Sequence, residues 1–201
     1  MKQFILLFLF IISGATMATE EPKYTVEAKT DHYEIRRYNS VLVAETKVEA
    51  SFEDAGNQAF RILADYIFGN NKSKTKVEMT APVTQQSPSE KIEMTAPVNQ
   101  VKTSDGFLVQ FTMPEKFNLQ NIPEPNDKRV QIKEIPPRRV SVYRYSGSWS
   151  ESRYKEKLEE FLSELKKNGV KTVGEPILAR YNSPFMIWFL RRNEIWIEIS
   201  D

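Results

Sequence analysis

Two stretches of the chain place apolar residues at three- and four-residue steps, which is the spacing of one face of a helix. In the first stretch, Ser51 and Asp54 have the spacing of a capping box, and Gly69 supplies the stop signal. The pattern therefore predicts a helix over about residues 51–69 that buries one face. The apolar residues of that face are Phe52, Ala55, Ala59, Leu63 and Tyr66.

The second stretch has the same design about a hundred residues later. Ser148 and Glu151 form another capping-box pattern, and Asn168-Gly169 ends the stretch. The predicted helix opens near Ser150, and we interpret its stripe as core packing. The stripe consists of Tyr154, Leu158, Phe161 and Leu165.

The remaining regular segments alternate apolar and polar residues, which is typical of strands with one covered face. Half-polar alternation favours antiparallel pairing. The segments are residues 33–38, 41–48, 107–113, 130–135, 140–145 and 195–199.

The two halves of the chain correspond in order and spacing. Ile35 lies 97 residues before Ile132, and Ser51 lies 99 residues before Ser150. Each half predicts a hairpin, a helix and two more strands, so we expect an internal duplication with halves at about 24–122 and 126–201. Joining both halves into one curved antiparallel sheet, with the two helices packed on it, gives an α+β fold with a cleft at the seam.

The first eighteen residues have the composition of a secretory signal peptide. Lys2 precedes nine unbroken apolar residues, 4–12, and small residues follow up to Ala18. Nine residues rise only about 14 Å as a helix, against a hydrocarbon core of about 30 Å, so a membrane anchor is not favoured. We predict cleavage after Ala18, with Ala15 as the alternative. The product would be a periplasmic or secreted domain of residues 19–201 without a stable membrane anchor.

Composition removes several classes of function. The chain has 28 Lys+Arg against 27 Asp+Glu, so it lacks the basic excess that nucleic-acid binding needs. It has no Cys, which excludes disulfides, thiolate metal sites and cysteine nucleophiles. It has one His, so a serine triad would have to use His32, and a site with several histidines is impossible.

An octapeptide occurs twice, at residues 76–83 and 91–98, with seven of eight residues identical. We predict that each copy is a short strand ended by Ala-Pro that shapes the rim of a cleft, because proline cannot donate to a ladder. Met79 and Met94 either fill core, the favoured interpretation, or line a soft apolar pocket. Glu78 and Glu93 have no His or metal partner nearby, and no catalytic motif occurs, so we expect no enzyme.

Several of these strings together resemble the SOUL haem-binding protein family, in its exported bacterial branch. They are residues 33–38, the doubled Met-Thr-Ala-Pro-Val, residues 111–114, 123–125, 139–142, 147–149 and 181–184, and the Arg-Arg-Asn-Glu-Ile-Trp of 191–196. The resemblance covers residues 24–199. It implies two β-α-β-β units in a distorted antiparallel barrel. It also implies non-covalent binding of haem or another tetrapyrrole in an apolar cleft beside the first helix.

The resemblance leaves the iron ligand open. Some members of the family have a His at the position of Arg37, and an arginine offers iron no lone pair. His32 is a weak metal candidate, and Met79, Met94 and tyrosines are others.

A ligand cleft for a porphyrin needs apolar walls and a cationic rim. The candidate wall residues are Phe60, Leu63 and Ile67 on the first helix, Met94 in the repeat, and Phe185, Met186 and Trp188 in a loop and strand over residues 181–190. The candidate rim cations are Arg61, Arg36 and Arg37.

Two functions follow as alternatives. The first is a haem or porphyrin carrier, buffer or scavenger outside the cytoplasm. The second is an effector-type binding module for another planar or amphipathic small molecule, in which a cleft acid such as Glu78 or Glu93 would face the ligand. A partner-binding protein is a further possibility without a sequence feature of its own.

Overall fold

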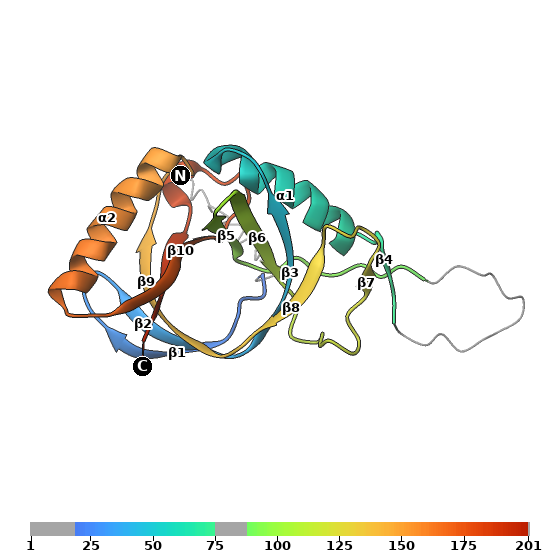
Figure 1. Cartoon of the computed structure of the whole chain (residues 1–201), viewed down its shortest axis with the longest axis horizontal. Helices are drawn as coiled ribbons and strands as arrows, with labels where there is room; N and C mark the ends of the chain where they lie inside the picture. Colours follow the sequence, from blue (N-terminus) through green and yellow to red (C-terminus); the bar gives the residue numbers. More distant parts are fainter. Residues whose placement is uncertain (1–18, 75–87, 201) are drawn as a thin grey trace, which may run out of the picture.

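The computed structural model describes residues 19–74 and 88–200. Over these residues the chain forms a nine-stranded, strongly curled antiparallel sheet with two long helices packed against it (Figure 1). The α+β prediction is confirmed. The predicted signal peptide and the first copy of the octapeptide, with Glu78 and Met79, lie outside the described residues.

The large sheet has the order β1-β2-β9-β11-β10-β5-β6-β3-β8, and a small second sheet pairs β4 with β7. Its strands are β1 (Tyr24–Lys29), β2 (Glu34–Tyr38), β3 (Val41–Val48), β5 (Val98–Thr103), β6 (Gly106–Thr112), β8 (Gln131–Ile135), β9 (Arg138–Tyr145), β10 (Thr172–Arg180) and β11 (Asn193–Ile199). The small sheet consists of β4 (Asn71–Lys72) and β7 (Glu124–Pro125).

The helices begin and end close to the predicted signals. Helix α1 (Phe52–Ile67) begins after Ser51, whose side chain accepts a hydrogen bond from the backbone N–H of Asp54. Helix α2 (Glu151–Lys167) has Ser150 as its N-cap, so the cap at Ser148 was wrong by two residues. The positive φ of Gly69 and Gly169 follows the two helix ends, as expected for glycine after a C-cap.

Alternation along the strands separates two faces of the sheet. On β11, Ile195 and Ile197 lie in the cluster formed with Phe161 and Leu165 of α2. Trp196 points to the opposite face, where it packs with strand residues and with Tyr181. Helix α1 covers the other half of the helix-bearing face through Ala55, Ala59, Leu63 and Tyr66. The buried stripe predicted for α1 is therefore confirmed.

The two helices meet at their N-terminal ends. The backbone N–H of Glu151 donates to Oε1 of Glu53 at 3.0 Å, and Figure 1 shows the two ends converging at the top of the molecule. The cleft described below opens beside this meeting point. Over the part of the chain that the structure describes, no helix is long and apolar enough to cross a membrane.

The second octapeptide differs from the prediction. Residues 91–97 form no strand, and β5 begins only at Val98. The segment is anchored at separate points instead: the N–H of Ile92 donates to the carbonyl of Ile67 at 2.8 Å, and the hydroxyl of Thr95 donates to the carbonyl of Thr112. Proline at 97 and these irregular contacts keep the segment out of the ladder, so that it lies along the edge of the cleft.

Candidate ligand cleft

A cleft of about 260 Å³ opens between the N-terminal half of α1, the second octapeptide and the segment that follows β10. Phe60, Met94, Ala96, Val98 and Trp149 supply apolar walls. The cleft is lined by Thr19, Gly56, Asn57, Phe60, Met94, Thr95, Ala96, Val98, Trp149, Arg180, Tyr181, Asn182, Ser183 and Pro184. These residues are far apart in the sequence and meet only in the fold.

Two of the predicted wall residues line this cleft. Phe60 of α1 is 37% exposed, and its ring lies 5.5 Å from that of Phe111. Met94 is 44% exposed, so the core interpretation of this methionine was wrong. Both present apolar surface that no described residue covers.

The other predicted residues of α1 lie elsewhere. Leu63 and Ile67 are fully buried in the core below α1, further towards the C-terminal end of the helix than Phe60, and they do not line the cleft. Arg61 is exposed and does not line the cleft. Only the part of α1 around Gly56, Asn57 and Phe60 faces the ligand space.

The segment 185–190 forms a turn and a short 3-10 helix (Trp188–Leu190) instead of the predicted strand. Its side chains are exposed, with Phe185 at 95% and Trp188 at 60%. It directly follows Ser183 and Pro184, which line the cleft. Phe185, Met186 and Trp188 therefore lie beyond the rim of the cleft rather than inside it.

Arg191 holds this apolar loop in place. Its guanidinium donates to the carbonyls of Met186 at 3.0 Å and Pro184 at 2.8 Å. It also lies over the Trp149 ring, 4.2 Å from the centroid. These contacts join the loop to the Trp149 wall of the cleft.

Among the described residues that line the cleft, Arg180 is the only one with a charged side chain. It donates to the side-chain oxygen of Gln100, and its guanidinium lies 5.4 Å from the centroid of the Trp149 ring. Its Nε is buried and has no hydrogen-bond partner within the described ranges. Burial lowers the pKa of Arg180 to about 10, opposed in part by Tyr145. The cation is thus partly desolvated and has no carboxylate partner in the part of the chain that the structure describes.

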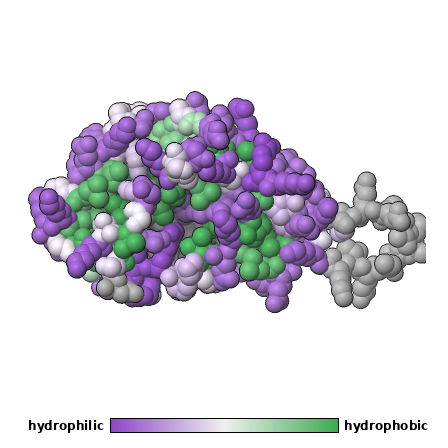
Figure 2. All heavy atoms as spheres, in the orientation of Figure 1, coloured by the Kyte–Doolittle hydropathy of each residue, from purple (hydrophilic) through white to green (hydrophobic). Residues whose placement is uncertain are grey.

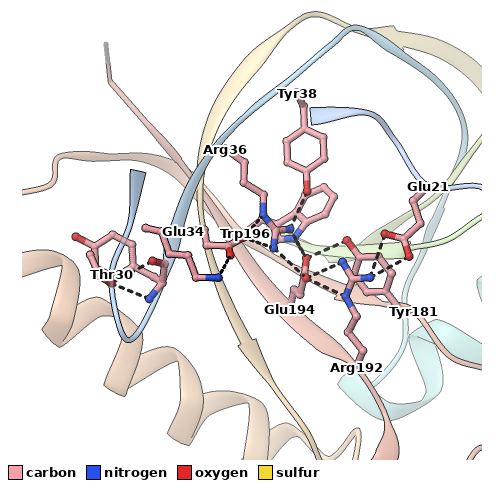
Figure 3. A network of polar contacts seen from close by, with 11 residues as sticks. Glu21, Thr30, Glu34, Arg36, Tyr38, Tyr181, Arg192, Glu194 and Trp196 are labelled. Atoms are coloured by element: carbon pink, nitrogen blue, oxygen red, sulfur yellow. Dashed lines mark hydrogen bonds and ion pairs between the residues drawn. The ribbon is translucent and has the colours of Figure 1, made fainter. Parts of the chain in front are cut away.

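The arginines predicted for the rim serve the scaffold. Arg36 is buried and donates to both carboxylate oxygens of Glu194, at 3.0 and 3.4 Å (Figure 3). Arg37 points away on the exposed side and pairs with Glu27 at 2.5 Å. Successive side chains of β2 face opposite sides of the sheet, so Arg36 and Arg37 point in opposite directions. Neither of them lines the cleft.

Glu194 is the centre of a buried polar network (Figure 3). Besides Arg36, its carboxylate accepts from Arg192 at 2.9 Å, from the Tyr181 hydroxyl at 2.9 Å and from the Trp196 indole at 2.8 Å. Burial raises the pKa of Tyr181 well above its ordinary value, and the Glu194 charge acts in the same direction. Because Tyr181 also lines the cleft, the network fixes one of its walls.

The cleft contains no imidazole or carboxylate among the described residues. His32 is exposed in the turn between β1 and β2 and does not line the cleft. It lies near Glu164 of α2 and contributes in a small part to lowering the pKa of that carboxyl. Glu93 is exposed and lies 3.8 Å from Lys116. Met94 and Tyr181 are therefore the side chains in the cleft that could face a metal.

A second cavity of about 390 Å³ lies on the other side of Thr95 and is the larger of the two. Four carboxylates, those of Glu20, Glu21, Glu115 and Glu134, line it with one lysine, Lys23. Its four carboxylates would repel an anionic ligand, so its charge argues against it as the ligand site although it is larger. We therefore take the Phe60–Met94 cleft as the candidate site.

Sequence reasoning missed Gly56, Trp149 and Arg180. A glycine inside a helical pattern was a signal that something approaches α1 closely. A β-carbon at residue 56 would lie 2.5 Å from the Arg180 guanidinium. Nothing in the local pattern linked these three residues, because only the packing of β10 and the start of α2 against α1 brings them together.

A model of the SOUL heme-binding protein family matches residues 19–198. The chain belongs to the SOUL heme-binding protein family. Membership accounts for the resemblance in the doubled Met-Thr-Ala-Pro-Val, whose second copy forms the edge of the cleft.

Two mammalian relatives of this SOUL protein cover most of its length. Heme-binding protein 2 of Homo sapiens is 29% identical over 169 residues, covering 82% of this chain and 77% of the human protein. Heme-binding protein 2 of Mus musculus is 26% identical over 176 residues, covering 86% of this chain and 80% of the mouse protein.

Solved structures with low identity share the fold alone. The C-terminal domain of EcmrR has a TM-score of 0.57 at 11% identity, covering 84% of this chain and 98% of that domain. A hydrolase from Listeria innocua has a TM-score of 0.56 at 11% identity, covering 87% of this chain and 94% of the hydrolase.

Proposed function

We propose that this SOUL protein binds haem or a related tetrapyrrole non-covalently in the cleft beside α1, as a carrier, buffer or scavenger outside the cytoplasm. The observation that carries the proposal is the cleft itself. Its apolar walls are Phe60, Met94 and Trp149, and within residues 19–74 and 88–200 its only charged lining residue is a cation, Arg180. The description of the family as heme-binding supports the same ligand class.

The residues of the cleft fit a tetrapyrrole in polarity. A porphyrin is a flat apolar plate that carries carboxylates, and it needs aromatic and aliphatic contacts together with a cation. Phe60 and Trp149 offer aromatic contacts, and Met94 is an adaptable thioether wall. The cleft alone is at the small end of ligand pockets, so a bound plate would extend over the exposed loop 185–190.

The chemistry at iron is limited by the ligands present. When bound, haem would supply a metal centre whose coordination the protein can tune. Met94 offers the only thioether in the cleft, within the part of the chain that the structure describes. Tyr181 stays protonated because burial raises its pKa, and its hydroxyl is engaged by Glu194 at 2.9 Å. Met94 is therefore the residue that we assign to the iron.

The alternative, an effector-type module for another planar or amphipathic molecule, depends on the charge of that molecule. Such a module was expected to place an acid at its ligand, but Glu93 pairs with Lys116 at the surface instead. A cleft with Arg180 and no acid favours anionic over cationic ligands. Mass spectrometry of the denatured purified protein would detect a different retained anion and decide for this alternative.

Removal of the signal peptide during export would place the new N-terminus at the opening of the cleft. Thr19 lines the cleft, and the next residue is anchored where the Glu20 carbonyl accepts from the N–H of Ala96 at 2.9 Å. Cleavage after Ala18 would leave the Thr19 α-amino group, cationic at neutral pH, at this position. The mass of the protein recovered from the periplasm or the medium would test this, and a mass that includes residues 1–18 would contradict it.

A hemin titration of purified residues 19–201 tests the binding function. We expect a saturable change in the Soret absorption, with quenching of tryptophan fluorescence because Trp149 lines the cleft. No change in either signal up to about 50 μM hemin would contradict the proposal, since that limit excludes even weak specific binding.

A further inference from the structure

Arg180 carries a positive charge at the cleft, and none of its contacts within the described fold is with a carboxylate. Its guanidinium lies at the cleft against α1, with a neutral acceptor, the Gln100 side chain, as its hydrogen-bond partner. The buried arginine of the scaffold, Arg36, has carboxylates on both sides at 2.7 and 3.0 Å. Arg180 is half-buried and has no carboxylate partner among the described residues. A partly desolvated cation without a counterion is unfavourable, and such groups are concentrated at functional sites.

The surroundings of Arg180 hold it ready for an external partner. Gln100 is oriented by its amide N–H, which donates to the carbonyl of Phe52 at 3.0 Å, so that its oxygen faces the guanidinium. The Trp149 ring covers one side of the cation at 5.4 Å. Nε remains without a hydrogen-bond partner among the described residues. Because Nε itself is buried, the donors available to a ligand are on the terminal nitrogens of the guanidinium, which lines the cleft and makes one hydrogen bond, to Gln100, among the described residues.

Gly56 makes room for this arrangement. A β-carbon at this position would lie 2.5 and 2.6 Å from the two terminal nitrogens of Arg180. Glycine is unfavourable inside a helix, so its presence in α1 needs a packing reason. The close approach of the guanidinium supplies that reason.

We infer that Arg180, positioned by Gly56, Gln100 and Trp149, is an anion subsite of the cleft that receives a carboxylate of the ligand. The inference rests on the proposed function and specifies the orientation of its ligand: a carboxylate-bearing edge enters towards Arg180, and the plate extends past Phe60 and Met94 towards the loop 185–190. A guanidinium and a carboxylate match in geometry and in charge.

The test compares hemin with hemin dimethyl ester, which has the same plate and iron but no free carboxylate. For the unaltered protein we expect the Kd for hemin to be at least about tenfold lower than that for the ester, the value of one charge-assisted hydrogen-bonded pair. In Arg180→Gln this preference should fall to about twofold or less through weaker hemin binding, with the Kd for the ester changed by less than about threefold.

Two further variants keep the test sharp. Gly56→Ala displaces the flexible end of Arg180 without removing charge, so it should reduce the preference while α1 keeps or gains stability. Arg144→Gln removes an exposed arginine that does not line the cleft, and should leave the preference unchanged. Circular dichroism confirms folding of each variant, and Gly56→Ala decides if Arg180→Gln fails to fold.

The outcomes separate the two claims. Equal affinity of the unaltered protein for hemin and its ester overturns the subsite and leaves the proposed function standing. A preference that persists in Arg180→Gln or in Gly56→Ala also overturns the subsite. Binding of neither compound to the unaltered protein overturns the proposed function, and the subsite with it.

Discussion

At the scale of single residues, this SOUL protein uses its arginines in two different ways. Arg36 and Arg192 surround the buried Glu194 and hold the sheet together (Figure 3). Arg180 is desolvated as well but meets only the neutral Gln100. Because a lone buried charge costs stability, the first kind belongs to the scaffold and the second belongs to the cleft.

Glu194→Gln tests the scaffold role. The substitution leaves two arginines facing a neutral, fully buried amide, so we expect the free energy of unfolding to fall by about 3–5 kcal/mol. Urea denaturation measures this loss. The matched control is Glu198→Gln on the same strand. The Glu198 carboxylate pairs with Arg138 and is 42% exposed, so we expect its loss to cost at most about 1 kcal/mol. Equal losses in both variants would refute a special role for the network.

Met94→Leu tests the ligand assigned to iron. Leucine keeps the apolar volume and removes the sulfur, so binding of metal-free protoporphyrin IX should change by less than about threefold. The absorption spectrum of bound hemin should change, because iron loses a thioether. Unchanged hemin spectra in the variant would show that Met94 is only a wall.

At the scale of elements, the halves of the chain are interleaved in the sheet. Taken in chain order, the strands β2, β3, β5 and β6 of the first half correspond to β8, β9, β10 and β11 of the second half. With this correspondence, the order of these eight strands across the sheet is the same from either end. The internal duplication stays a prediction. This interleaving explains how β10 of the second half comes to lie beside β5 of the first, which brings Arg180 to Gln100.

The loop after β10 is the element that fits the sheet least. Six consecutive large apolar residues, 185–190, are exposed. Trp188→Ser should change the free energy of unfolding by less than about 0.5 kcal/mol, because the side chain is 60% exposed. If a bound plate extends over this loop, the Kd for hemin rises by about threefold or more.

Leu162→Ser is the control for that loop. Leu162 is 40% exposed on α2 and does not line the cleft, so its loss should leave the Kd for hemin unchanged. An unchanged Kd in Trp188→Ser as well would confine the ligand to the cleft and exclude the loop.

Sequence patterns predicted the elements better than the site. Period and capping signals gave both helices and six strands, because local burial determines them. Phe60 and Met94 were found as wall residues. Leu63 was predicted as a wall residue but lies in the core, because an apolar side chain in a sequence does not distinguish a core position from a cleft wall. No sequence pattern indicated that Arg180 meets Gly56, since that approach depends on how β10 and α1 pack together. The contact of Arg180 with Gln100, 80 residues away, likewise depends on the pairing of β10 with β5.

At the scale of the whole molecule, surface ion pairs tie the edge of the sheet together. Glu27 on the edge strand β1 accepts from Arg139 of β9 at 2.7 Å and from Arg37 of β2 at 2.5 Å. These bonds, Arg139 first, lower the pKa of Glu27 below its ordinary value of 4.5. Asp105, Asp127, Glu156, Glu160 and Glu164 are lowered in the same way by their basic partners.

The direction of these pKa shifts predicts acid sensitivity. A carboxyl whose pKa is lower in the folded state contributes stability above its unfolded pKa, and that contribution is lost as the pH falls through the folded pKa. We expect stability to decline as the pH falls below about 4.5, less steeply in Glu27→Gln. Urea denaturation over a pH series measures the slopes. A Glu27→Gln slope equal to that of the unaltered protein, or of the exposed Glu159→Gln control, would contradict the prediction.

The most direct measurement for the whole molecule is hemin binding when the cleft is filled. Asn57 lines the cleft from the exposed side of α1, so Asn57→Trp fills the space without disturbing the core. The neighbouring Gln58 is also exposed but does not line the cleft, so Gln58→Trp is the matched control. We predict saturable hemin binding by the unaltered protein and by Gln58→Trp, and a Kd at least about tenfold higher for Asn57→Trp. Equal binding by all three proteins would contradict the assignment of the ligand to this cleft.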